Sequence, residues 1–113
     1  MPTLFTRIIQ RELPARIVYE DEHVVGFADI NPQAPVHVLF VPRREIATLN
    51  ELGAADADLV GRLVLAAAAY AKQEGFAESG YRTVFNCNRD AGQTVFHIHL
   101  HLLAGRVLAW PPG

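Results

Sequence analysis

Apolar residues and histidines alternate strictly near the end of the chain, from Phe96 to Leu102, with a further apolar residue on each side, Val95 and Leu103. A strand points successive side chains to opposite faces, so this alternation predicts a strand over Val95 to Leu103. One face of that strand would be polar and the other apolar. The polar face would carry His97, His99 and His101, and the apolar face Phe96, Ile98, Leu100 and Leu102.

Four further segments are rich in β-branched and aromatic residues and are bounded by turn residues, which is typical of strands. They cover residues 16–20, 23–30, 36–41 and 81–87. Asp21-Glu22 joins the first two segments as a hairpin. Residues 31–35 contain two prolines, which remove backbone donors and fix the backbone, so we expect an irregular loop there.

Two segments have the pattern of helices. From about Asp56 to Glu74 alanine is dense, apolar residues recur at helical spacing, and Gly75 suits the helix end. The inward positions are Leu59, Leu63, Ala66, Ala67 and Tyr70. A shorter helix is predicted from Thr3, which can cap it, to about Glu12, and a helical turn within residues 46–52. These elements predict one α+β domain over residues 1–113, a five-stranded antiparallel sheet with one long and one short helix.

Composition narrows the class of protein. Half of the 113 residues are apolar and 19% are charged, which suits a globular domain. The net charge of -2 gives no general attraction to nucleic acid or to a membrane surface. No apolar run reaches the length of a membrane span, and the start lacks the shape of a signal peptide. The lone Cys87 excludes an intrachain disulfide, which fits a reducing compartment. From these features together we expect a cytoplasmic protein with neither nucleic-acid nor membrane partners.

A metal site is one interpretation of the histidine row. Along a strand His97 and His101 would lie about 13 Å apart at Cα, whereas zinc–nitrogen bonds are only about 2.0 to 2.1 Å. Two adjacent rings could converge on one ion, but three on a flat strand could not. His37, Cys87 and scattered carboxylates are the remaining candidate ligands. We therefore expect no metal and no cofactor, and keep a metal site as the weaker alternative.

Nucleophilic catalysis fits the row better. Neutral imidazole is a good nucleophile near neutral pH, because its ordinary pKa is about 6.5 and neighbouring imidazoles oppose its charging. The preceding Gly92-Gln93-Thr94 offers a glycine, backbone N–H groups, an amide and a hydroxyl, which could hold phosphate oxygens. The plainer alternative is a set of polar side chains on a solvent-facing strand.

The run His97-Ile98-His99-Leu100-His101-Leu102-Leu103 resembles the motif of the histidine triad superfamily at every position. The stretch from Phe27 to His37 and the ending Trp110-Pro111-Pro112-Gly113 are similar to its Hint branch. The resemblance implies a homodimer whose sheets join into one ten-stranded sheet. It also implies hydrolysis of purine nucleoside 5′-phosphoramidates, in which His99 attacks phosphorus and forms a nucleotidyl-histidine intermediate without a metal.

The resemblance also implies roles for individual residues. Ribose contacts would come from Asp29 and Ile30. Phosphate contacts would come from Asn86, Gly92, Gln93, Thr94, His99 and His101. Thr94 would supply the hydroxyl near the leaving group, and His97 and His37 would complete the polar surroundings. An apolar slot for the base could be formed by Phe5, Ile8, Phe27 and Leu39.

The chain departs from the family pattern in places. Many bacterial relatives carry a Cys-x-x-Cys pair that binds structural zinc with histidines, whereas Thr3 and Thr6 stand here, so we expect no zinc. The phosphate loop usually has more glycine than here, where Asn88 and Ala91 stand; Asn88 tolerates a left-handed conformation and Ala91 does not. The alternatives left open are hydrolysis of dinucleoside polyphosphates and a nucleotide-binding module with little catalysis.

Overall fold

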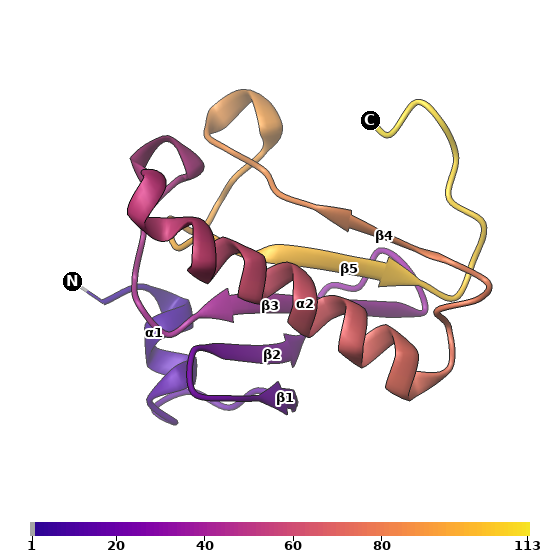
Figure 1. The fold of residues 1–113 in the computed structure, drawn as a ribbon, viewed down its shortest axis with the longest axis horizontal. Helices are drawn as coiled ribbons and strands as arrows, with labels where there is room; N and C mark the ends of the chain where they lie inside the picture. The colour runs from indigo at the N-terminus through magenta and orange to yellow at the C-terminus, as the bar shows by residue number, and fades with distance from the viewer. Residues whose placement is uncertain (1) are drawn as a thin grey trace.

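The computed structural model describes residues 2–113 and has the predicted α+β architecture (Figure 1). The helices are α1 (Leu4–Ile9) and α2 (Ala57–Glu74), with three short 3-10 turns between or after them. The strands are β1 (Ile17–Glu20), β2 (Val24–Ala28), β3 (Val36–Pro42), β4 (Tyr81–Val84) and β5 (Leu100–Ala104). They form one antiparallel sheet in the order β1-β2-β3-β5-β4, so the predicted five-stranded sheet is confirmed. Neither helix of the described chain is long and apolar enough to cross a membrane.

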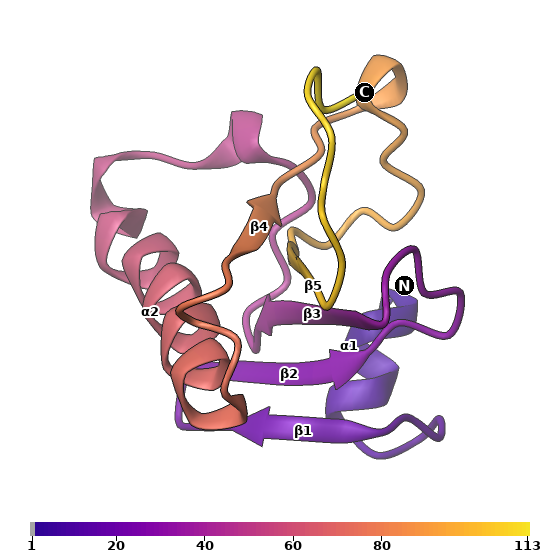
Figure 2. The same ribbon diagram turned by 90° about the vertical axis from the view of Figure 1, so that its right-hand side faces the viewer.

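The long helix α2 lies across one face of the sheet (Figure 2). Its predicted inward face is confirmed, because Leu63, Ala66 and Ala67 are buried in the same apolar cluster as Phe40 and Leu100. The alanines let the helix approach the sheet closely. Gly75 ends the helix in the left-handed conformation, with φ 87°, as its position predicted.

The short helix α1 lies on the opposite face and covers a smaller apolar cluster. Phe5 and Ile8 are buried there against Phe27 and Leu39. The helix is shorter than predicted, because the backbone at Arg11 takes φ 63° and turns the chain before Glu12. Thr3 is the N-cap as expected, since its hydroxyl accepts a hydrogen bond from the Thr6 amide.

The last strand differs most from the sequence prediction, because β5 begins at Leu100 and not at Val95. Its neighbour β3 ends at Pro42, which has no N–H to donate and whose carbonyl accepts from the His97 ring. The ladder therefore cannot continue, and Ile98 donates its N–H to the Ile46 carbonyl instead. The edge strand β4 is shorter than predicted for a similar reason, since β5 extends no further to pair with it.

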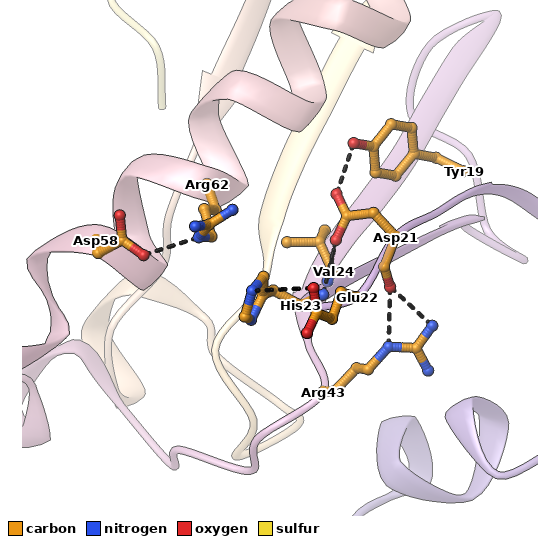
Figure 3. Close-up of polar contacts among 8 residues, drawn as sticks. All are labelled: Tyr19, Asp21, Glu22, His23, Val24, Arg43, Asp58 and Arg62. Carbon is orange, nitrogen blue, oxygen red and sulfur yellow. Dashed lines mark hydrogen bonds and ion pairs between the residues drawn. The ribbon is translucent and has the colours of Figure 1, made fainter.

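The hairpin of β1 and β2 is held by a polar cluster far from the histidine motif in sequence (Figure 3). Asp21 accepts hydrogen bonds from the amides of His23 and Val24, and from the hydroxyl of Tyr19. The Arg43 guanidinium donates to the Asp21 carbonyl. These contacts fix the turn and the register of the strands that follow it.

Candidate active site

The register of β3 against β5 brings two histidines together. Leu39 lies opposite His101, and His37 lies opposite Leu103, so both imidazoles project from the face of the sheet that α1 covers. Their ring centroids are 5.2 Å apart. The pairing of two strands thus places His37, distant in sequence, beside the histidine motif.

A cavity of about 240 Å³ opens on this face between α1 and the sheet. The four residues predicted to form an apolar slot, Phe5, Ile8, Phe27 and Leu39, all line it. Of the other predicted site residues, Asp29, Ile30, Thr94, His99 and His101 line it as well. Leu4, Pro14, Ala15, Ala28 and Val95 complete the wall. No periodic or chemical pattern in the sequence had indicated Pro14 and Ala15.

The protonation of His99 follows from its contacts. Its Nδ1 lies 2.8 Å from the carbonyl oxygen of His97, and a carbonyl can only accept, so Nδ1 carries the proton. The Nε2 of the neutral ring is then an unprotonated lone pair. Burial lowers the pKa of His99 below its ordinary value, which keeps the ring neutral at pH 7. The Phe5 ring packs edge-on against it at 4.9 Å and fixes its plane.

A chain of hydrogen bonds also sets the protons on His37 and His101. The Gln33 amide donates to Nδ1 of His37 at 3.0 Å, so His37 carries its proton on Nε2. That Nε2 donates to Nδ1 of His101 at 2.9 Å and lies 3.4 Å from a carboxylate oxygen of Asp29. The remaining proton of His101 is therefore on its Nε2. Gln33 is a site residue that the sequence did not indicate.

His101 has an unsatisfied donor. Its Nε2 is buried and has no hydrogen-bond partner within residues 2–113, which costs about 1–3 kcal/mol. Burial, with smaller contributions from His99 and His37, lowers the pKa of His101 from 6.5 to about 4. The side chain thus offers a neutral N–H donor, and an acceptor entering the cavity that His101 lines could pair with it.

Asp29, His37 and His101 also bring three potential metal-donor atoms within 4.8 Å of one another. Their hydrogen bonds do not suit a metal ligand set. A neutral His37 bound to a metal through Nε2 would carry its proton on Nδ1, where the Gln33 N–H already points. The donors fit a proton-sharing chain better than an ion.

His97 lies on the same side of the sheet as His99 and His101, but it does not line the cavity. Its ring packs against Phe5 of α1, with the two centroids 6.0 Å apart, and is fully buried. Its Nε2 donates to the Pro42 carbonyl at 2.8 Å, and its Nδ1 lies 2.9 Å from the Thr3 hydroxyl. The predicted start of the strand is therefore wrong, because β5 begins at Leu100, but the three imidazoles share the α1 side of the sheet as predicted. The His97 carbonyl holds His99.

The loop before the histidines is closed by its own hydrogen bonds. The side-chain amide of Gln93 donates to the carbonyls of Ala47 and Val95 and accepts from the Asn88 amide. The backbone N–H groups of Gly92 and Gln93 bond within the loop as well. A phosphate contact from either residue would have to replace one of these bonds.

The remaining predicted residues have varied positions. Asn86 follows β4, is half-buried and does not line the cavity, whereas Thr94 is exposed at its wall. Ile30 is 95% exposed at its rim. Ala91 lies in a 3-10 turn and needs no positive φ, so the difficulty foreseen for it does not arise. The left-handed position falls on Gly92, with φ 81°.

Similarity to known proteins agrees with this geometry. Residues 10–108 match the family model described as HIT domain. The purine nucleoside phosphoramidase of Escherichia coli (strain K12) is 51% identical over 94% of this chain and 89% of its own length. The 14 kDa zinc-binding protein of Zea mays is 46% identical, over 99% and 88% of the two chains. The crystal structure of a HIT family hydrolase from Legionella pneumophila Philadelphia 1 has a TM-score of 0.97 at 48% identity, covering 99% and 100% of the two chains.

Proposed function

Because the chain belongs to the HIT family, we propose that it hydrolyses purine nucleoside 5′-phosphoramidates, releasing AMP or GMP and an amine. The name of the Escherichia coli relative, at 51% identity, supports this choice of substrate. The observation that carries the proposal is the hydrogen bond from His99 Nδ1 to the His97 carbonyl. It leaves the lone pair of Nε2 free on a neutral ring that lines the cavity of about 240 Å³.

The reaction that we propose has two steps. Nε2 of His99 forms a bond to phosphorus as the P–N bond breaks, giving a nucleotidyl-histidine and a free amine. The departing amine takes up a proton, which we assign to the Thr94 hydroxyl at the cavity wall, with water restoring it. A water molecule then breaks the bond between phosphorus and His99 and releases the nucleoside monophosphate.

The unsatisfied N–H of His101 supports a phosphate position beside His99, since the two ring centroids are 4.9 Å apart. A phosphate oxygen accepting from that N–H would satisfy the buried donor and stabilise the charge of the transition state. His37 would hold His101 in the required protonation state. We assign Gln93 and Gly92 to the shape of the loop beside the phosphate and leave Asn86 as a family-based expectation.

We assign the nucleoside to the rest of the cavity. The Asp29 carboxylate would accept from the ribose hydroxyls, with Ile30 covering the sugar from the rim. The base would lie against the apolar wall that Phe5 and Phe27 form, where the two buried rings pack edge to face with centroids 5.3 Å apart. The aromatic and aliphatic walls favour a flat purine ring by stacking and apolar contact.

We also propose the homodimer that the family resemblance implied. The strand β4 is an edge of the sheet, so its outer backbone groups are free to pair with a second copy. Exposed apolar side chains on α2, Val64 and Leu65, would be covered in such a dimer. Light scattering on the purified protein should give twice the mass of 12.5 kDa.

The mechanism is tested by incubating the protein and its His99→Asn variant with an adenosine 5′-phosphoramidate. Loss of the nucleophile should reduce kcat/KM by about a thousandfold or more, and denaturing mass spectrometry should find the nucleotidyl adduct only on the parent protein. His23→Asn is the matched control, because His23 is a partly exposed histidine that does not line the cavity.

Three results would contradict the proposal. Equal turnover by the His99→Asn variant would exclude His99 as the nucleophile. Faster turnover of a dinucleoside polyphosphate than of the phosphoramidate would favour that substrate class. AMP binding without any turnover would indicate a nucleotide-binding module.

A further inference from the structure

A second polar cluster lies behind the histidines, at the start of α1. It joins Thr3 and Thr6 of that helix, Glu45 after β3, and the buried ring of His97. The Thr3 amide donates to the Glu45 carboxylate at 2.9 Å, and the Thr6 hydroxyl donates to the same oxygen at 2.7 Å. These two bonds, the amide bond first, lower the pKa of Glu45 below its ordinary value, so it stays an acceptor at pH 7.

The proton of each group in this cluster can be assigned. His97 donates through Nε2 to the Pro42 carbonyl, and burial lowers its pKa, so its Nδ1 is an unprotonated acceptor. The Thr6 hydroxyl gives its proton to Glu45 and lies 3.4 Å from that Nδ1. The Thr3 hydroxyl, at 2.9 Å, is therefore the group that donates to His97.

We propose that Thr3, and through it Thr6 and Glu45, are positioning residues for the nucleophile. The hydrogen bonds to both nitrogens of His97 fix its ring, and the carbonyl of the same residue holds Nδ1 of His99 at 2.8 Å. A displacement of His97 would move that carbonyl and the orientation of His99 with it. This inference rests on the proposed role of His99.

The cluster does this without a metal. The maize relative is named a zinc-binding protein, and the family resemblance placed a zinc-binding cysteine pair at the positions of Thr3 and Thr6. Threonine hydroxyls are not among the usual zinc ligands, which are cysteine, histidine and carboxylate. Only Glu45 and one nitrogen of His97 could act as ligands in this cluster, too few for a structural zinc site. Hydrogen bonds hold His97 in this chain.

The test compares Thr3→Val, which removes the hydroxyl, with Thr3→Ser, which keeps it. Thr3→Val should lower kcat by about tenfold to a hundredfold, because the nucleophile is displaced. KM should change little, because the residues that line the cavity keep their positions. Thr3→Ser should restore most of kcat. Thr6→Val should have a smaller effect, since Thr6 acts on His97 only through Glu45 and Thr3.

A spectroscopic measurement is independent of turnover. In the parent protein, 15N NMR of the histidine rings should find Nδ1 of His97 unprotonated and Nδ1 of His99 protonated. Thr3→Val should shift the Nδ1 resonance of His97 and broaden that of His99. Thr48→Val is the matched control: it removes a threonine cap bond to the Asn50 amide that does not involve the histidines.

The outcomes separate this inference from the proposed function. If Thr3→Val leaves kcat and both histidine resonances unchanged, the positioning role is wrong, and the role of His99 stands. If Thr3→Val and Thr48→Val lower kcat equally, the effect is general destabilisation and the inference is also overturned. If Thr3→Val does not fold, Thr6→Val, which keeps the cap of α1, decides by the same two measurements.

Discussion

The two faces of the sheet are built from the same strands and use them differently. On the face under α2, Phe40, Leu100 and Leu102 are almost fully buried and continuous with Leu63 of the helix. On the face under α1, apolar Leu39 lies between His37 and Val41 of its own strand and opposite His101, and a cavity of about 240 Å³ remains open. The first face is closed by packing, whereas the second keeps room for a ligand.

The two faces of the sheet also differ in the polar groups that they hold. The face under α1 buries His37 and His101, whose pKa values burial lowers, and leaves one donor of His101 without a partner. Each of these features costs folding free energy and suits a site that waits for an anionic ligand. The comparison implies that stability depends mainly on the α2 face and chemistry on the α1 face, so substitutions should separate the two.

The largest expected effect is on stability, from Leu63→Ala on the α2 face. Leu63 is fully buried, so its truncation should lower the free energy of unfolding by about 2–5 kcal/mol in urea denaturation. The kcat of the molecules that remain folded should be unchanged, because no group of the cavity has moved. A parallel fall in kcat and stability would show that the two faces are not independent.

The next effect is the loss of stability in acid, which the α1 face should cause. His101 has a pKa of about 4 when folded and 6.5 when unfolded, so below pH 6.5 the unfolded chain binds the extra proton. Above pH 6.5 His101 therefore does not reduce the free energy of unfolding. Between pH 6.5 and 4 its protonation in the unfolded chain lowers that free energy, by up to about 3 kcal/mol.

Urea denaturation at several pH values measures this loss. His101→Asn should flatten the dependence between pH 6.5 and 4, because the variant lacks the group whose pKa burial lowers. An equal slope in His101→Asn and the parent would place the acid sensitivity outside the α1 face.

The fold was more predictable than the site, and the two faces show why. The helical spacing of apolar residues predicted α2 and its inward residues, and the glycine at position 75 predicted its end. Each of these depends only on residues close together in the sequence. The four-residue apolar slot was also predicted correctly as a group. These features follow from the burial of apolar side chains, which the spacing of those residues along the chain reveals.

The histidine segment was predicted less well, because its conformation depends on a distant strand. Strict alternation indicated a strand over the whole motif, but β3 ends at Pro42 and leaves residues 95–99 without a partner. The contacts of Gln33 and Thr3 with histidine rings also join segments remote in sequence. No local pattern of amino acids carries that information.

A smaller effect should come from the loop beside the cavity, where Asn88 holds φ 65° and ψ -168°. This region strongly favours glycine, so the residue stores strain of about 1–3 kcal/mol. Asn88→Gly should raise the free energy of unfolding by about 1 kcal/mol, because relief of strain exceeds the added entropy of the unfolded chain.

Chemical denaturation of Asn88→Gly measures the change. Gly61→Ala, in the middle of α2 with open space around it, is the control for a glycine change on the other face. If Asn88→Gly is destabilising, the asparagine side chain must stabilise the loop in a way that outweighs the strain.

The smallest expected effect is a shift in the acid limb of the rate. The negative charge of Asp29 raises the pKa of His99, although burial, the larger influence, leaves it below 6.5. Asp29→Asn removes that charge, so the pKa of His99 should fall further. Because the attacking ring must be neutral, the acid limb of kcat should move to lower pH. Asp58→Asn, which changes an exposed aspartate on α2, should leave the limb in place.

The pH profile of kcat at saturating phosphoramidate measures the shift. The saturating substrate keeps any weaker ribose binding from entering the result. A limb that moved to higher pH would mean that Asp29 does not act on His99 as a charge, and the polar chemistry of the α1 face would have to be assigned to other groups.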